Sequence, residues 1–139
     1  MITDFLEFDD DVDLLDIISE ASRQKEKINN IQNSIKTMFS HMIKYQYNPR
    51  RQTKSWVSTI IREYKNIISY SIKELNRYID TDILDESYKN GRNEAVNEDE
   101  DNIIHKIAPK SRPYNWDLEF ITSLDCIVDF LNINEYNLY

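Results

Sequence analysis

Glycine, proline, cysteine and histidine are scarce in this chain of 139 residues, which contains one Gly, three Pro, one Cys and two His. Strand-rich folds need many tight turns, and those turns favour Gly, Asn-Gly or Pro. The scarcity of turn residues therefore predicts helices. The lone Cys126 excludes an internal disulfide, argues against Cys-based metal coordination, and fits a reducing cytoplasm.

The signatures of common enzymes are missing as well. One glycine, Gly91, is too few for a Gly-rich phosphate loop, and His41 and His105 form neither an HExxH motif nor an i, i+4 pair. Cys126 lies in an apolar helical run, where we expect a buried structural thiol rather than a nucleophile. We therefore expect no enzyme activity, no metal and no cofactor.

Long apolar runs are also absent, because no stretch approaches the roughly 20 residues that a membrane-spanning helix requires. The N-terminal residues, MITDFLEFDDDVD, are acidic and lack the charged and apolar regions of a signal peptide. These observations predict a cytoplasmic protein that does not enter a membrane.

The charge that is present is strongly negative and unevenly distributed. The net charge is −8, with eight acids in residues 1–22, five in 94–101 and five in 113–139, and no Lys or Arg in any of these segments. Binding to nucleic acid or to an anionic membrane needs a basic footprint, so neither is expected. The acids are interpreted as a solvated surface or as a face that meets a basic partner. The candidates for such an acidic partner face are Asp9, Asp10, Asp11, Asp13, Asp16, Glu98, Asp99, Glu100 and Asp101.

Apolar periodicity predicts an all-α fold. We expect a helical bundle built on a long antiparallel hairpin with helices at about 11–46 and 53–79, a third helix at about 82–97, and a C-terminal helix at about 116–132. Pro49 ends the first helix, and Thr53 or Ser55 caps the second. The chain is expected to form a single domain over 1–139, with 1–10 and 133–139 loosely ordered. The clearest stripe consists of Ile28, Ile31, Ile35, Met38, Met42 and Tyr45.

Basic and aromatic residues crowd the segment 41–62, around the turn of this hairpin. On a helical wheel Lys44 points away from the apolar stripe, and Arg62 lies opposite the stripe of its own helix. One interpretation is a pocket for a small anion or nucleotide. The other, which we favour, is a structural turn in which Trp56 and Tyr47 close the core and Arg62 pairs with the third helix. The candidate anion or partner patch comprises His41, Lys44, Tyr47, Arg50, Arg51, Trp56 and Arg62.

The stretch HMIKYQYNPRRQTKSWVSTIIREYKNI resembles the signature of a bacterial family catalogued as domain of unknown function 29. Further similar segments occur at 87–95, 107–109 and 112–114, so that the resemblance covers roughly 14–131. Tyr45 departs from the family's usual Trp. The resemblance implies an all-helical fold and no settled activity. The matching residues are His41, Lys44, Gln46, Tyr47, Pro49, Arg51, Ser55, Trp56, Ile60 and Arg62.

Three functional hypotheses follow. The leading one is a small cytosolic adaptor or regulator that acts by protein–protein interaction with a partner that has a basic surface. The alternative is a phage or mobile-element inhibitor of a nucleic-acid-handling host machine, such as a CRISPR effector, that presents an acidic surface resembling DNA. The third is a metal-independent nuclease that uses His41, Arg51 and Arg62. The sequence does not fix the oligomeric state.

Overall fold

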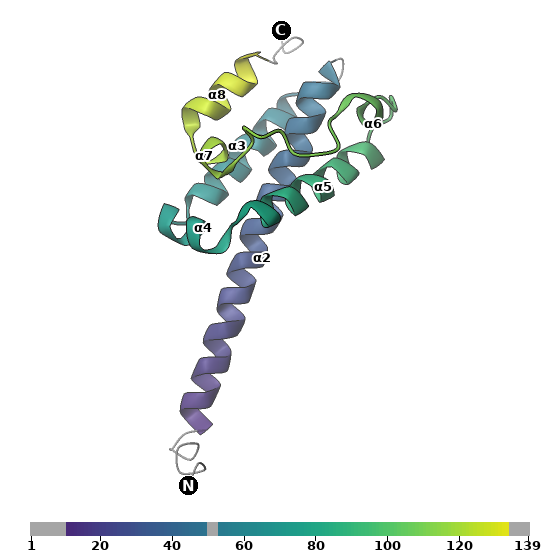
Figure 1. Ribbon diagram of the computed structural model, residues 1–139. Coiled ribbons are helices and arrows are strands. Elements are labelled where there is room, and N and C mark those ends of the chain that lie inside the picture. The colour runs from purple at the N-terminus through teal and green to yellow at the C-terminus, as the bar shows by residue number, and fades with distance from the viewer. Residues whose placement is uncertain (1–10, 50–52, 134–139) are drawn as a thin grey trace. The chain divides into compact units, whose positions relative to one another are not determined.

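The computed structural model describes residues 11–49 and 53–133, and every regular element within these ranges is helical (Figure 1). The all-α prediction is confirmed. The chain divides into two compact units, one up to Asn30 and one from Ile31, which are treated separately below. Residues 1–10 and 134–139, expected to be loosely ordered, lie outside the described ranges, whereas Ile133 is helical. The expectation of a single domain stays a prediction.

The first unit contains the beginning of helix α2 (Asp11–Tyr47), which continues into the second unit. Gly and Pro are absent from this 37-residue helix, so nothing in its sequence interrupts it. The expected helix at 11–46 is therefore confirmed. All side chains from Leu14 to Glu26 are exposed, and Arg23 pairs with Glu20 at 2.6 Å.

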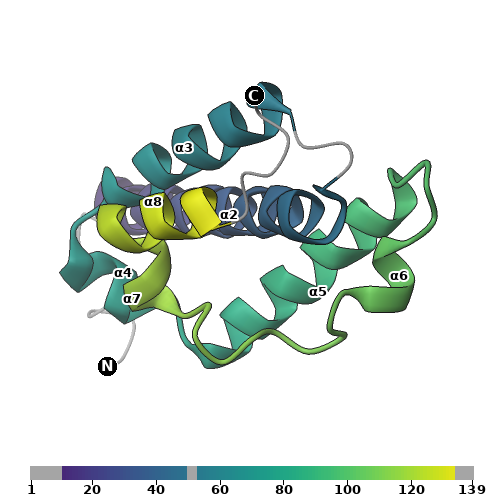
Figure 2. The same cartoon turned by 90° about the horizontal axis from the view of Figure 1, so that it is seen from above.

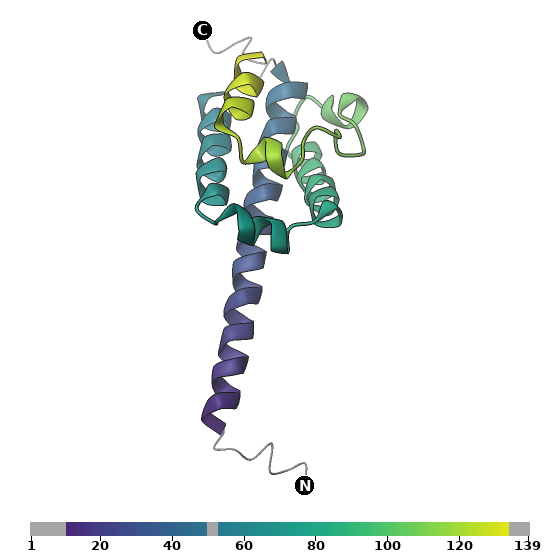
Figure 3. The same ribbon diagram turned by 60° about the vertical axis from the view of Figure 1, so that its left-hand side comes forward.

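The second unit is organised around the last part of α2, from Ile31 to Tyr47, which lies between α3 and α5 (Figures 2 and 3). Helix α3 (Lys54–Ile68) runs antiparallel to it, so the expected hairpin is present. The Thr53 side chain accepts a hydrogen bond from Trp56 N at 3.1 Å and caps α3, as expected.

The expected second helix at 53–79 is wrong as a continuous element, because it breaks between Ile68 and Ile72. Ser71 and Glu74 form a capping box that starts the separate helix α4 (Ile72–Tyr78). The Ser69 hydroxyl donates a hydrogen bond to the backbone carbonyl oxygen of Asn66 at 2.6 Å. Side-chain bonds of this kind compete with the backbone hydrogen bonds that continue a helix. The stripe of apolar residues continues through this part of the sequence, so it gives no indication that the helix breaks here.

Helix α5 (Thr81–Asn97) is the expected third helix, capped by Asp80, which accepts from Ile83 N at 2.9 Å. Gly91 in its middle is the point at which α5 approaches α2 closely. A Cβ atom at this position would lie 2.7 Å from Lys36 O and 3.0 Å from Ser40 N. Glycine weakens an isolated helix, but here it allows two helix backbones to pack together.

The expected C-terminal helix at 116–132 is also two elements, α7 (Leu118–Ile121) and α8 (Leu124–Ile133). Asp117 caps α7 by accepting from Phe120 N, and the Thr122 hydroxyl donates to Leu118 O at 2.8 Å. Ser123 then accepts from Cys126 N near the start of α8. Local side-chain capping again divides a region that is periodic in sequence.

Aromatic rings from distant parts of the chain fill the core of the second unit. Trp116 lies 5.8 Å from Phe39, 5.9 Å from Tyr88 and 5.7 Å from Phe130, measured between ring centroids. Such pairs each add about 0.5–1.5 kcal/mol beyond the burial of their area. Trp116 lies in the connection between the short helix α6 (Ile104–Ile107) and α7, so these ring contacts pack that connection against α2, α5 and α8.

No helix within 11–49 and 53–133 combines the length and apolarity that crossing a membrane requires.

Candidate functional site

Lys44 is buried rather than exposed, and its ammonium group pairs with Glu98 at the C-terminal end of α5. Its expected position, pointing away from the apolar stripe of α2, did not predict this burial. Because α5 covers a second side of α2, a residue outside the apolar stripe is enclosed as well. A buried cation is costly without a partner, and Glu98 supplies one.

Asn48, at the end of α2, is held by two carboxylates from the loop after α5. Its Nδ2 donates to Asp99 Oδ1 at 3.1 Å and to Asp101 Oδ2 at 3.0 Å. The other Asp99 oxygen accepts from the backbone N–H groups of Ile103 and Ile104, both at 2.7 Å. Asp99 thus joins α2 to the start of α6, and its first role is structural.

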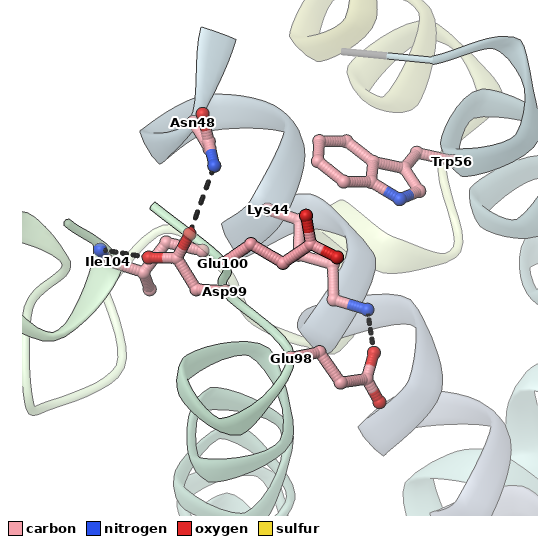
Figure 4. Close-up of a pocket in the computed structure, with 7 residues that line it drawn as sticks. All are labelled: Lys44, Asn48, Trp56, Glu98, Asp99, Glu100 and Ile104. Carbon is pink, nitrogen blue, oxygen red and sulfur yellow. Dashed lines mark hydrogen bonds and ion pairs between the residues drawn. The ribbon is translucent and has the colours of Figure 1, made fainter. Parts of the chain in front are cut away.

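Lys44, Asn48, Glu98 and Asp99 are among the residues that line a cavity of about 210 Å³, which we name the acidic pocket (Figure 4). It joins members of both candidate sets, since Lys44 and Trp56 belong to the basic and aromatic patch and three carboxylates belong to the acidic face. One lysine against three carboxylates gives the lining a formal charge of +1 − 3 = −2. The lining residues are Lys44, Asn48, Trp56, Glu98, Asp99, Glu100 and Ile104.

One polar atom of this lining is unsatisfied. Asn48 is 2% exposed, and its Oδ1 has no hydrogen-bond partner within the described part of the chain. Buried carbonyl oxygens nearly always accept at least one hydrogen bond, because leaving them unpaired costs about 1–3 kcal/mol.

In the described part of the chain, neither His41 nor Arg62 lines the acidic pocket, and neither lines any of three other cavities. His41 Nδ1 lies 2.9 Å from Thr37 O, and because a carbonyl can only accept, Nδ1 carries the proton. Burial lowers the pKa of His41 below its ordinary value, although the bond to Thr37 opposes this. Arg62 pairs with its neighbour Glu63 at 3.0 Å, so the expected pairing with the third helix is wrong.

The other candidates are placed as follows. Arg50, Arg51, Asp9 and Asp10 lie outside the described residues, and the side chains of Asp11 and Asp13 do too, although their backbone is helical. Asp16 is exposed in the first unit. Whether the acids of the two units share one face stays a prediction.

A second cavity, of about 420 Å³, was not anticipated from the sequence, and we name it the aromatic pocket. Burial raises the pKa of its Tyr47 hydroxyl. Cys126 is only half-buried and borders it, so the expected buried thiol is wrong. A signal was available, since Pro109 and Pro113 mark a non-helical connection in the sequence and both line this cavity. The lining consists of Gln46, Tyr47, Pro109, Pro113, Asn115, Trp116, Phe120, Cys126, Asp129 and Phe130.

No group of three or more His, Cys, Asp or Glu side chains suited to a metal ion occurs in the described ranges.

The helices and pockets described above define a small all-α protein built on an antiparallel helical hairpin. A family model described as domain of unknown function DUF29 matches residues 7–123, and the chain therefore belongs to the DUF29 family. No curated protein and no solved structure matches the chain.

Proposed function

We propose that this chain is a cytoplasmic adaptor or regulator that binds a partner protein through the partner's basic surface. The acidic pocket would receive a lysine or arginine side chain of that partner. The observation that supports this proposal is the joining of the Trp56 ring with Glu98, Asp99 and Glu100 around one cavity (Figure 4).

The chemistry of the pocket suits a cation. Its lining has a formal charge of −2, which attracts a positive group and raises the rate of encounter with a basic surface. The face of an indole ring attracts ammonium and guanidinium groups, and the aliphatic stem of either side chain can pack on the ring.

An anion site fits the described residues less well, because basic side chains of the second unit are engaged within the fold. Lys44 pairs with Glu98, and Arg112 pairs with Asp85 at 2.8 Å. The Arg92 guanidinium donates to the carbonyl oxygens of residues 105 and 108. Guanidinium and ammonium groups used in this way cannot also converge on a phosphate.

The test is affinity capture from the native host, identification by mass spectrometry, and titration of the purified partner. We expect a partner with a basic surface. Trp56→Ala and Glu100→Gln should each weaken binding by about tenfold or more. The matched control is Glu119→Gln, the same charge change at an exposed residue outside the pocket, which should alter affinity by less than about twofold. Recovery of no partner, or full affinity of Trp56→Ala, contradicts the proposal.

The alternative function, inhibition of a nucleic-acid-handling host machine by DNA mimicry, is favoured by a different observation. Residues 113–132 contain four acids and no base, and Glu119, Asp125 and Asp129 among them are exposed. This alternative predicts that the captured partner is a nuclease or helicase and that duplex DNA competes with the chain for it. It also predicts that Trp56→Ala leaves inhibition intact.

A further inference from the structure

An apolar face is exposed on the first unit. Leu14, Leu15, Ile17 and Ile18 are between 53% and 65% exposed, although each is a large aliphatic side chain. Single exposed leucines are common, but four within five residues form a patch of the kind that usually meets another surface.

The spacing of the residues along this face indicates that it packs against a second helix. Leu14, Ile17, Ala21, Gln24 and Ile28 recur at alternating steps of three and four, which is the a and d pattern of a coiled coil. Such a seam packs against a second helix with the same pattern. At the next position of the repeat, Ile31 is fully buried in the second unit, so the seam is available up to Ile28. Leu15 lies outside the seam.

The charges beside the seam indicate the orientation of that second helix. Residues 11–20 carry four acids and no base, whereas residues 23–27 carry three bases, Arg23, Lys25 and Lys27, and one acid. A parallel pair of identical helices would place the two acidic ends side by side. An antiparallel pair places each acidic end beside the basic segment of the other helix, which opposite charges favour.

We propose that residues 17–28 of α2 pair antiparallel with the same segment of a second copy of the chain. With Ala21 opposite Gln24 of the second copy, Ile17 meets Ile28, and Glu20 lies beside Lys27 across the flank. The polar Gln24 in an otherwise apolar seam fixes this register at some cost in affinity. The pairing is independent of the acidic pocket and of the proposed partner.

The first test measures the mass of the purified full-length chain by sedimentation over a range of concentrations. We expect a dimer. Ile17→Glu should raise the dissociation constant by about 100-fold or more, because a symmetric interface loses the contact twice. The matched control is Leu15→Glu, an equally exposed residue outside the seam, which should leave the dimer intact. A monomeric wild-type chain at all concentrations, or equal loss in both variants, overturns the proposal.

The second test resolves the orientation by exchanging charges. Glu20→Lys and Lys27→Glu should each weaken the dimer, and the double variant should restore it if the helices are antiparallel. In a parallel pair Glu20 would instead face Lys25 of the second copy, so Glu20→Lys with Lys25→Glu would restore it. Restoration by the Lys25 combination alone refutes the antiparallel arrangement. Circular dichroism of each variant verifies that the helix has formed.

Discussion

Replacing Gly91 with alanine is expected to destabilise the second unit, although the same change stabilises most helices. In a helix interior alanine is favoured over glycine by about 1 kcal/mol. At this position, however, the new methyl group would lie 2.7 Å from Lys36 O and 3.0 Å from Ser40 N. Both are backbone atoms of α2 and cannot rotate away.

The magnitude follows from comparing these two effects. Relieving the overlap requires α5 to move away from α2, and overpacking of this kind costs about 1–3 kcal/mol. The movement also pulls on the Lys36–Glu94 ion pair, at 2.9 Å, and on the Phe39–Tyr88 ring contact. After the gain in helix propensity is subtracted, we expect a net loss of about 1 kcal/mol, which lowers Tm by roughly 3–5 °C.

Urea unfolding followed by circular dichroism measures this difference. The matched control is Asn93→Ala, an exposed position two residues further along α5, which should be neutral or slightly stabilising. Gly91→Val, with a larger side chain, should be worse than alanine. If Gly91→Ala is as stable as the wild-type chain or more so, the close approach of α5 to α2 is wrong.

Three further predictions concern the acidic pocket and its surroundings. Glu98→Gln should cost about 1–3 kcal/mol of unfolding free energy because it strands the buried Lys44 charge, whereas Lys44→Met, which removes that charge, should cost less; urea titration of both variants checks this order. Asp99→Ala should cost about 2 kcal/mol and raise amide hydrogen exchange at Ile103 and Ile104, and unchanged exchange there would contradict the role of its carboxylate as the acceptor of both N–H groups. Because burial lowers the folded-state pKa of His41 below 6.5, its contribution to stability is complete above that pH and is lost as the pH falls towards the folded-state value; His41→Gln should flatten this dependence in thermal unfolding between pH 7.5 and 5.

Helices were predictable here because their causes are local. The alternating steps of three and four from Ile28 to Tyr45, and the near absence of glycine and proline, are enough to predict α2 and the hairpin. The breaks within the predicted helices at 53–79 and 116–132 were not predicted, because a stripe of apolar residues indicates which side chains are buried and not whether the helix is continuous. Ser71 followed by Glu74 is a capping box visible in the sequence, and it could have indicated where α4 begins.

The pocket was less predictable because its residues are brought together by packing between distant segments. Lys44 and Glu98 are separated by 54 residues, and helical periodicity places Lys44 outside the apolar stripe. Its burial depends on α5, whose close approach depends in turn on Gly91. The composition of both segments was visible in the sequence, but their meeting around Trp56 was not.

The chain's two tryptophans, Trp56 and Trp116, lie in different surroundings, and this has a practical consequence for spectroscopy. Trp116 is almost fully enclosed by aromatic rings, so its fluorescence should change when the second unit unfolds. Trp56 borders the acidic pocket, so its emission should respond to an arriving cationic group. Replacing Trp56 with phenylalanine would leave Trp116 as a reporter of unfolding, and replacing Trp116 would leave Trp56 as a reporter of binding in the folded chain, without any attached dye.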